Sequence, residues 1–354
     1  MRVLITGGAG FIGSTLALAL AERHPEWQVV ACDNLYRRGS EMNVPRLKQA
    51  GVQFVHADVR HADDLARVGA IDAMVECSAE PSVMAGLEGA GEFVVQTNLM
   101  GVYYCFELAA RHGAQVIFLS TSRVYPVAAQ ERLAYREADT RFELSDEQPV
   151  AGASALGVAE AFPLAGARTL YGASKLAAEL LLAEFAETYG IRTVIDRCGV
   201  VAGPWQLGKV DQGVFTHWML SFYFEQPLAY FGYGGTGKQV RDLLHVDDLV
   251  ELIERQLSAP DEWNGRTLNV GGGREVSLSL AETTELCREL TGREVRVGSA
   301  GEDRPGDVRI YLTDASRLFG VTDWRPRRSA LDTLSDIASW LREHEALVLS
   351  ALDS

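Results

Sequence analysis

A tyrosine and a lysine four residues apart could form an acid–base pair in this sequence. Tyr171 and Lys175 begin the segment YGASKLAAELLLAEFAETYG, whose apolar spacing predicts a long helix. Residues at positions i and i+4 share one face of a helix, so the two side chains would lie together. A phenol has a pKa of about 10, and a nearby ammonium group stabilises its phenolate. Tyr171 could then exchange a proton with a hydroxyl or carbonyl group during hydride transfer, although such a pair alone is more often part of a solvated face.

Three hydroxyl side chains form a second candidate group, in the segment FLSTSRVYP at residues 118–126. Ser120, Thr121 and Ser122 follow an apolar run that predicts a strand, and Arg123 comes next. In a parallel sheet, the carboxyl ends of the strands open into the ligand crevice. The hydroxyl run is therefore expected to end a strand, and one of its members could take part in catalysis.

Glycines near the N-terminus predict a dinucleotide site. The spacing Gly7-x-x-Gly10-x-x-Gly13 lies between an apolar run, RVLITGG, and a helical pattern, STLALALAER. Such a loop aims backbone N–H groups and the helix dipole at a phosphate. The next predicted strand, WQVVACDNL, carries Asp33, whose carboxylate could accept hydrogen bonds from the adenosine ribose. Together these features favour NAD over a ligand-free glycine turn.

Two neighbouring features leave part of this prediction open. Arg37 and Arg38 follow Asp33 closely, and arginines at this place can accommodate the extra phosphate of NADP. Asp58 ends the next predicted strand, VQFVHADV, where it could meet the adenine edge or only stabilise a turn.

Strands and helices alternate through the first half of the chain. The alternation continues with the segment AMVECSA, a helix from about Glu92 to His112 and the strand AQVIFLSTS. Such alternation predicts an α/β fold with a doubly wound parallel sheet of the Rossmann type. After VIDRCGVVAGP the pattern becomes irregular, which indicates a smaller, discontinuous α/β domain for the substrate. We expect an NAD-binding domain over 1–196 plus about 238–262, and a substrate-binding domain over about 197–237 and 263–345.

Composition restricts the class of protein. The chain has 354 residues, is 47% hydrophobic and carries a net charge of −15, which disfavours nucleic acid as a partner. No apolar run has the length of a membrane helix, and the N-terminus lacks a signal-peptide pattern, so we expect a cytoplasmic protein. The five cysteines show no CxxC spacing, so neither a disulfide framework nor a metal site is expected.

These motifs as a set resemble the extended short-chain dehydrogenase/reductases of the nucleotide-sugar epimerase and dehydratase group. The resemblance covers nearly the whole chain, through TGGAGFIG, DNL, STSRVY, YGASK, GTGKQVRDLLHVDDL and RPGDV. It implies NAD as cofactor, a nucleotide sugar as substrate and a homodimer built on the helices that begin near Gln96 and Tyr171. It also implies a catalytic set of Thr121, Tyr171 and Lys175.

The remaining site residues follow from the same resemblance. Residues implied to contact NAD are Gly7, Gly10, Phe11, Ile12, Gly13, Asp33, Asn34, Asp58, Val59, Ser78, Ala79, Asn98, Ser120, Tyr171 and Lys175. Residues implied to contact the substrate are Glu80, Ser122, Arg123, Lys209, Gln212, His217, Arg241 and Arg304. The arginines suit the diphosphate because a guanidinium binds phosphate oxygens in pairs.

Within this group, the segments CDNLYRRGSEMNV, EADTRFE, VDQGVFTHW and GKQVRDLLHVDDL are most similar to the CDP-tyvelose (CDP-paratose) 2-epimerases. That similarity implies transient oxidation at carbon 2 of the sugar and return of hydride to the opposite face. The related 4,6-dehydratases follow the threonine with an Asp-Glu pair, whereas Ser122 and Arg123 stand there in this chain. Elimination of water is therefore not expected.

Some segments differ from those of the relatives and leave the substrate open. They are ECSAEPSV at 76–83, Pro126 after Tyr125, and a long Ala- and Gly-rich stretch at 146–167. The alternatives are a 4-epimerase, a reductase or a decarboxylase of a UDP-, GDP- or dTDP-sugar. A dinucleotide-sensing regulator is a remote alternative, because the catalytic Tyr171 and Lys175 are both present.

Overall fold

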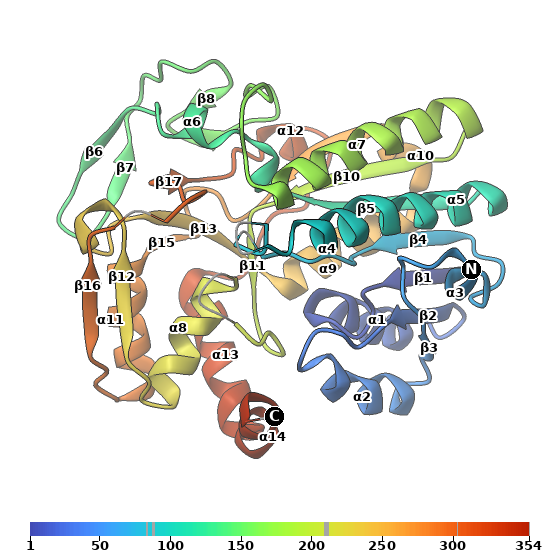
Figure 1. The fold of residues 1–354 in the computed structure, drawn as a ribbon, viewed down its shortest axis with the longest axis horizontal. Coiled ribbons are helices and arrows are strands. Elements are labelled where there is room, and N and C mark those ends of the chain that lie inside the picture. Colours follow the sequence, from blue (N-terminus) through green and yellow to red (C-terminus); the bar gives the residue numbers. More distant parts are fainter. Residues whose placement is uncertain (83, 87–88, 209–211, 303, 354) are drawn as a thin grey trace.

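A seven-stranded parallel sheet forms the centre of the molecule (Figure 1). The computed structural model describes residues 1–82, 84–86, 89–208, 212–302 and 304–353. The strand order is β14-β10-β5-β4-β1-β2-β3, and every pair is parallel. This arrangement confirms the predicted doubly wound sheet. The strands are β1 (Arg2–Thr6), β2 (Gln28–Asp33), β3 (Gln53–His56), β4 (Ala73–Glu76), β5 (Gln115–Thr121), β10 (Thr193–Cys198) and β14 (Arg266–Val270).

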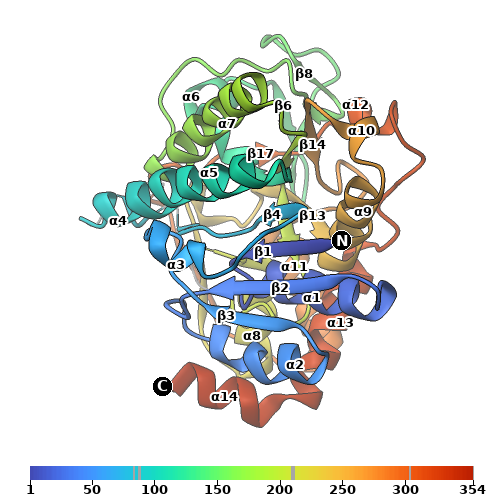
Figure 2. The ribbon, with the colours of Figure 1, turned by 90° about the vertical axis from the view of Figure 1, so that its right-hand side faces the viewer.

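Helices cover both faces of this sheet; Figure 2 shows α5 and α7 above β4 and β1, and α2 below β3. Successive strand residues point to opposite faces, so Val3 and Ile5 belong to one core while Leu4 belongs to the other. The covering helices are α1 (Phe11–Arg23), α2 (Asn43–Gln49), α9 (Val246–Ser258), α10 (Pro260–Trp263) and α12 (Ser316–Phe319) on the first core, and α3 (Ala62–Ala66), α4 (Gly91–Val95), the π-helical turn η2 (Gln96–Gly101), α5 (Val102–His112) and α7 (Leu170–Tyr189) on the second. In the described part of the chain, no helix is long and apolar enough to cross a membrane.

A smaller lobe lies beside the carboxyl ends of the main strands, on the left in Figure 1. Its four-stranded sheet contains β11 (Val200–Ala202), β13 (Val240–His245), β15 (Ser277–Ser279) and β17 (Ile310–Tyr311), and a parallel pair joins β12 (Leu228–Phe231) to β16 (Val297–Ala300). Its apolar core is built by α8 (Val214–Tyr223), α11 (Leu280–Thr291), α13 (Ala330–Glu343) and α14 (Glu345–Asp353).

The stretch between Tyr125 and α7 forms short elements at the edge of this lobe. They are α6 (Val127–Gln130) and the hairpins β6 (Tyr135–Glu137) with β7 (Phe142–Leu144) and β8 (Ala153–Ser154) with β9 (Gly157–Val158). Phe142, Leu144 and Val158 bury their side chains in a fourth cluster with Ile310 and Leu312. The long insertion is thus packed against the smaller lobe.

The strand within residues 238–262 belongs to the smaller sheet and not to the main one. Residues 238–262 are expected in the NAD-binding domain, but their strand, β13, pairs with β11, β15 and β17 in the smaller sheet. Their helix, α9, does pack on the main core through Leu249 and Ile253. The last main strand is β14, which lies in the range expected for the substrate domain. A short buried strand fits either sheet equally, so the apolar run alone could not choose between them. The two-domain division itself stays a prediction.

A buried carboxyl group in the main sheet makes stability depend on pH. Asp196 on β10 is fully buried; Gln256 Nε2 donates to its Oδ1 at 3.0 Å, and its Oδ2 has no hydrogen-bond partner among the described residues. Burial raises the pKa of Asp196 from 3.8 to about 7. Because the folded state binds this proton more tightly than the unfolded chain, stability falls as pH rises from about 4 through about 7.

We expect Asp196→Asn to raise the free energy of unfolding by about 2–4 kcal/mol at a pH of about 8, and to change it little at a pH of about 4. Denaturant unfolding at both pH values measures the difference. Asp63→Asn, on the exposed surface of α3, is the control. An equal effect of Asp196→Asn at both pH values would contradict the assignment.

Candidate active site

A cavity of about 830 Å³ lies at the carboxyl ends of the main strands and is lined by residues of both the main sheet and the smaller lobe. Its lining includes residues that directly follow β1, β4 and β5, together with residues of α7, α8 and β12. This is the crevice in which open parallel sheets bind ligands. Its volume lies toward the upper end of the range of about 300–1,000 Å³ that small-molecule and cofactor sites occupy.

The predicted glycine loop forms one end of this cavity. Gly7 has φ = +59°, a backbone conformation that residues other than glycine rarely adopt. A Cβ added at Gly13 would lie 2.3 Å from the Gly7 carbonyl oxygen, so only glycine lets α1 approach the loop this closely. Gly10 precedes α1 without a side-chain cap, so the N–H groups of the first turn can meet an anion. The loop therefore fits the pyrophosphate of a dinucleotide.

Asp33 supports the same loop from the end of β2. Its Oδ2 accepts a hydrogen bond from Ala9 N at 3.1 Å, and its Oδ1 accepts one from Leu35 N at 2.8 Å. Burial raises the pKa of Asp33, and these backbone donors partly offset the effect. Asp33 lines the cavity with Asn34, Arg37 and Val59, where the adenosine half of a dinucleotide would lie.

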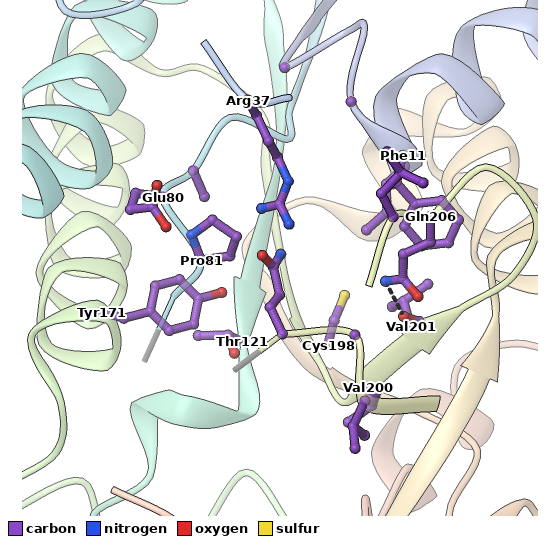
Figure 3. A pocket seen from close by; sticks show the side chains of 18 of the residues that line it. Phe11, Arg37, Glu80, Pro81, Thr121, Tyr171, Cys198, Val200, Val201 and Gln206 are labelled. Carbon is purple, nitrogen blue, oxygen red and sulfur yellow. Dashed lines mark hydrogen bonds between the residues drawn. The ribbon is translucent and has the colours of Figure 1, made fainter. Parts of the chain in front are cut away.

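The predicted catalytic residues Thr121, Tyr171 and Lys175 all line the cavity, and Figure 3 shows Thr121 and Tyr171 next to each other. Thr121 ends β5 and accepts a hydrogen bond from Arg123 N at 3.2 Å, which begins a 3₁₀ turn, η3 (Ser122–Val124). Tyr171 lies in the first turn of α7, whose start is capped by Thr169. Burial raises the pKa of Tyr171 to about 12, while Thr121 and the Arg123 charge act to lower it. A working base at neutral pH therefore needs further positive charge nearby.

Lys175 supplies positive charge one turn after Tyr171, but it is almost wholly enclosed. Its side chain is 2% exposed, and its Nζ lies 4.2 Å from the centre of the Phe118 ring. Behind it, the fully buried Glu76 ends β4, and the Glu76 Oε2 lies 3.5 Å from Lys175 Nζ. Glu76 is not among the residues predicted from the sequence. The sequence could have indicated Glu76 through its position at the end of an apolar strand, because Asp33 and Thr121 occupy equivalent positions.

A second buried ion pair connects α7 to β10 next to the site. Glu179, one turn after Lys175, accepts hydrogen bonds from Arg197 Nη2 at 2.7 Å and Arg197 Nε at 3.0 Å. The Ser120 hydroxyl also donates to Glu179, although Ser120 lines the cavity too. Arg197 Nη1 donates to the Tyr125 hydroxyl at 3.2 Å, and Tyr125 donates to Asn269 at 2.7 Å. Sequence reasoning gave no role to Glu179 or Arg197.

Three predicted arginines line the end of the cavity toward the smaller lobe. Arg123 Nη1 donates to the Gly306 carbonyl at 2.8 Å, and Arg241 Nη2 pairs with Asp307 at 2.5 Å. The Arg304 guanidinium lies 3.7 Å from the centre of the Phe231 ring. Removal from water lowers the pKa of Arg123, and the Arg241 charge adds to that effect. This concentration of positive charge suits a diphosphate.

Most of the other predicted residues are also brought to the cavity. Ser78, Ala79, Glu80, Ser122, Gln212 and His217 line it with Gly10, Phe11 and Ile12. Figure 3 shows Glu80 and Pro81 on the same side as Tyr171, with Cys198 and Val200 across from them. Lys209 lies outside the described residues.

Two predicted residues do not line the cavity. Asp58 pairs with Arg60 at 2.6 Å and accepts a hydrogen bond from Asn34 at 3.0 Å. Burial acts to raise the pKa of Asp58, but the bonds from Arg60 and Asn34 outweigh it and lower the pKa. Asn98, on the π-helical turn, uses its side chain to bind both the N–H and the carbonyl of Glu80, at 2.7 and 2.9 Å. Asn98 therefore holds the Glu80 backbone at the cavity wall.

Comparisons with known proteins find relatives along nearly the whole chain. A sequence model of the NAD dependent epimerase/dehydratase family matches residues 3–271. The chain is 29% identical over 351 residues to CDP-paratose 2-epimerase from Salmonella typhi, which covers 96% of this chain and 99% of that protein. It is 28% identical over 349 residues to dTDP-glucose 4,6-dehydratase from Mycobacterium tuberculosis, with 98% and 95% covered. A solved UDP-glucose 4-epimerase from Thermus thermophilus, in complex with NAD, has a TM-score of 0.77 at 25% identity, with 97% and 99% covered.

Proposed function

Because the chain belongs to the NAD dependent epimerase/dehydratase family, we propose that it inverts one ring carbon of a nucleotide sugar, with no net oxidation or reduction. NAD is the cofactor of this family, and the glycine loop and Asp33 fit it. The substrate we propose is a CDP-linked sugar related to CDP-paratose, inverted at carbon 2. The observation that carries the proposal is the meeting of Thr121, Tyr171 and Lys175 at the dinucleotide cavity, with Arg123 beside Thr121.

Tyr171, Lys175 and Thr121 have different roles in the reaction at one sugar hydroxyl group. NAD, when bound, supplies the acceptor and later the donor of hydride. Tyr171 takes the proton from the hydroxyl as the carbon is oxidised, and Lys175 stabilises the resulting phenolate charge. Thr121 holds the reacting oxygen by a hydrogen bond. The keto sugar then presents its other face, and Tyr171 returns the proton to the oxygen, so the sugar leaves with inverted configuration.

Dehydration is the second candidate, because dTDP-glucose 4,6-dehydratases are also among the relatives. Elimination of water needs a carboxyl group near the sugar. Among the described residues, three carboxylates line the cavity: Asp33, Glu80 and Asp307. Asp33 is bound to the glycine loop, and Asp307 is paired with Arg241. Of these three carboxylates, Glu80, which lies on the same side as Tyr171 in Figure 3, is the one that could act as the acid or base of an elimination.

A panel of nucleotide sugars in deuterated water tests the two candidates. We expect an epimerised product without deuterium at the inverted carbon, because hydride returns from within the site. CDP-sugars should react fastest, with UDP-, GDP- and dTDP-sugars as comparisons. NMR spectroscopy reads both the configuration and the label. A product lighter by one water molecule would favour dehydration, and stoichiometric consumption of NADH or NADPH would favour a reductase.

We also propose a homodimer formed through α5 and α7. Leu180 and Tyr189 on α7 are 65% and 59% exposed, which leaves apolar surface on the outer face of that helix. The site residues Tyr171 and Lys175 lie on the same helix and face the cavity. An interface on α7 would therefore leave the cavity open to substrate.

A further inference from the structure

We propose that Glu76 is the buried counter-ion that keeps Lys175 protonated and in place, and so acts as a positioning residue for the catalytic pair. The inference rests on the proposed function for the roles of Lys175 and Tyr171. The contact between Glu76 and Lys175 can be tested without any turnover.

The Glu76 carboxylate is fixed through one oxygen and directed at Lys175 with the other. Its Oε1 accepts hydrogen bonds from Thr6 Oγ1 at 3.2 Å, from Ser78 N at 3.0 Å and from the Ser78 hydroxyl. Its Oε2 has no hydrogen-bond partner among the described residues and lies 3.5 Å from Lys175 Nζ. The carboxylate is fully buried, so water cannot take the place of the lysine. This orientation places one negative charge directly behind the ammonium group.

Lys175 needs such a partner because its surroundings are otherwise neutral or apolar. A buried ammonium group without a counter-ion readily loses its proton. The Phe118 ring offers only the modest attraction of an aromatic face. Three thiols also surround the pair, and burial raises the pKa of each, so they stay neutral: Cys77 after β4, Cys105 on α5 and Cys198 on β10.

Other charged groups around the site are already paired or act on Tyr171. Glu179 on α7 is bound to Arg197 and Ser120. The Arg123 charge acts on Tyr171, where it partly opposes the rise in pKa that burial causes. In the described part of the chain, Glu76 is therefore the one carboxylate within ion-pair distance of Lys175 Nζ. The Glu76 charge also acts to raise the pKa of Tyr171, but a neutral Lys175 could not stabilise the phenolate at all.

Lysine NMR provides a direct test, because the chain has only four lysines: Lys48, Lys175, Lys209 and Lys238. The protein is labelled with [ε-¹³C]lysine, saturated with NAD and titrated from about pH 6 to about pH 11. Lys175→Met assigns the signal. We expect Glu76→Gln to lower the Lys175 midpoint by about 2 pH units or more relative to the native protein, with the signals of Lys48 and Lys238 unchanged as internal controls.

Two further measurements make the test decisive. Glu76→Asp keeps the charge but withdraws it by about one carbon–carbon bond, so its Lys175 midpoint should lie between those of the native protein and Glu76→Gln. In an assay of epimerisation, Glu76→Gln should lower kcat by about 10-fold or more at a pH of about 9, and by less at a pH of about 7 where Lys175 is protonated again. KM for the sugar should change little.

The proposal is overturned by an unchanged Lys175 midpoint in a Glu76→Gln protein whose NMR spectrum shows that it is folded. If the protein epimerises none of the sugars tested, the proposed function fails, but the lysine titration still decides the role of Glu76.

Discussion

Tyr171→Phe is expected to lower kcat by about 10²–10⁴-fold, the usual contribution of a general base, while NAD remains bound. The substitution removes one oxygen atom and keeps the ring that fills the cavity wall beside Thr121. Lys175, on the same helix, is not placed to act as the base instead of Tyr171, because its ammonium group is enclosed between Phe118 and Glu76. Initial rates with the best sugar of the panel give kcat, and the NAD content of the purified protein is read after denaturation.

Tyr104→Phe is the matched control for that experiment. Tyr104 lies on α5 and does not line the cavity. The same loss of a phenol oxygen should therefore leave kcat and the NAD content unchanged. A Tyr171→Phe protein with native activity and bound NAD would remove Tyr171 from the role of base.

Gly13→Val should weaken NAD binding by about 100-fold or more, which corresponds to about 2.7 kcal/mol. The first atom of any side chain at Gly13 would lie 2.3 Å from the Gly7 carbonyl oxygen and 2.9 Å from the Gly8 Cα. These backbone atoms cannot move away, because the loop is itself packed tightly: a Cβ added to Gly8 would lie 2.7 Å from the Ala31 side chain. The loop must therefore open, and the N–H groups at the start of α1 lose their alignment with the phosphates.

Isothermal titration with NAD measures this loss, and thermal unfolding shows whether the fold survives. Gly301→Ala is the control, since a Cβ at Gly301 meets no atom within 4 Å. It should bind NAD like the native protein. Native affinity in Gly13→Val would show that the pyrophosphate binds elsewhere.

The sequence predicted those features that are encoded by neighbouring residues. The glycine loop, Asp33 and the pair of Tyr171 and Lys175 each depend on local spacing at the start of a helix or the end of a strand. The alternation of strands and helices likewise predicted the main parallel sheet, which the structure confirms. Periodicity could not place β13, because a short buried strand gives the same pattern in either sheet.

The remaining site residues depend on contacts between distant segments. Asp58 follows a strand end as Asp33 ends one, yet its carboxylate pairs with Arg60 and does not line the cavity. Glu76 also ends a strand, but its meaning appears only when α7 brings Lys175 within 3.5 Å. The direction of a side chain at a strand end is set by such neighbours, so local spacing predicts the position and tertiary packing decides the role.

The ion pair of Glu179 with Arg197 has a consequence for how new specificities could arise on this scaffold. It ties α7 to β10, and Ser120 joins β5 to the same carboxylate. This network thus connects the elements that carry Thr121, Tyr171 and Lys175. The segments proposed to recognise the nucleotide sugar, around Phe231, Arg241 and 304–307, line another part of the cavity. Substitutions in those segments, by evolution or by design, could therefore change the substrate specificity while the catalytic residues keep their arrangement.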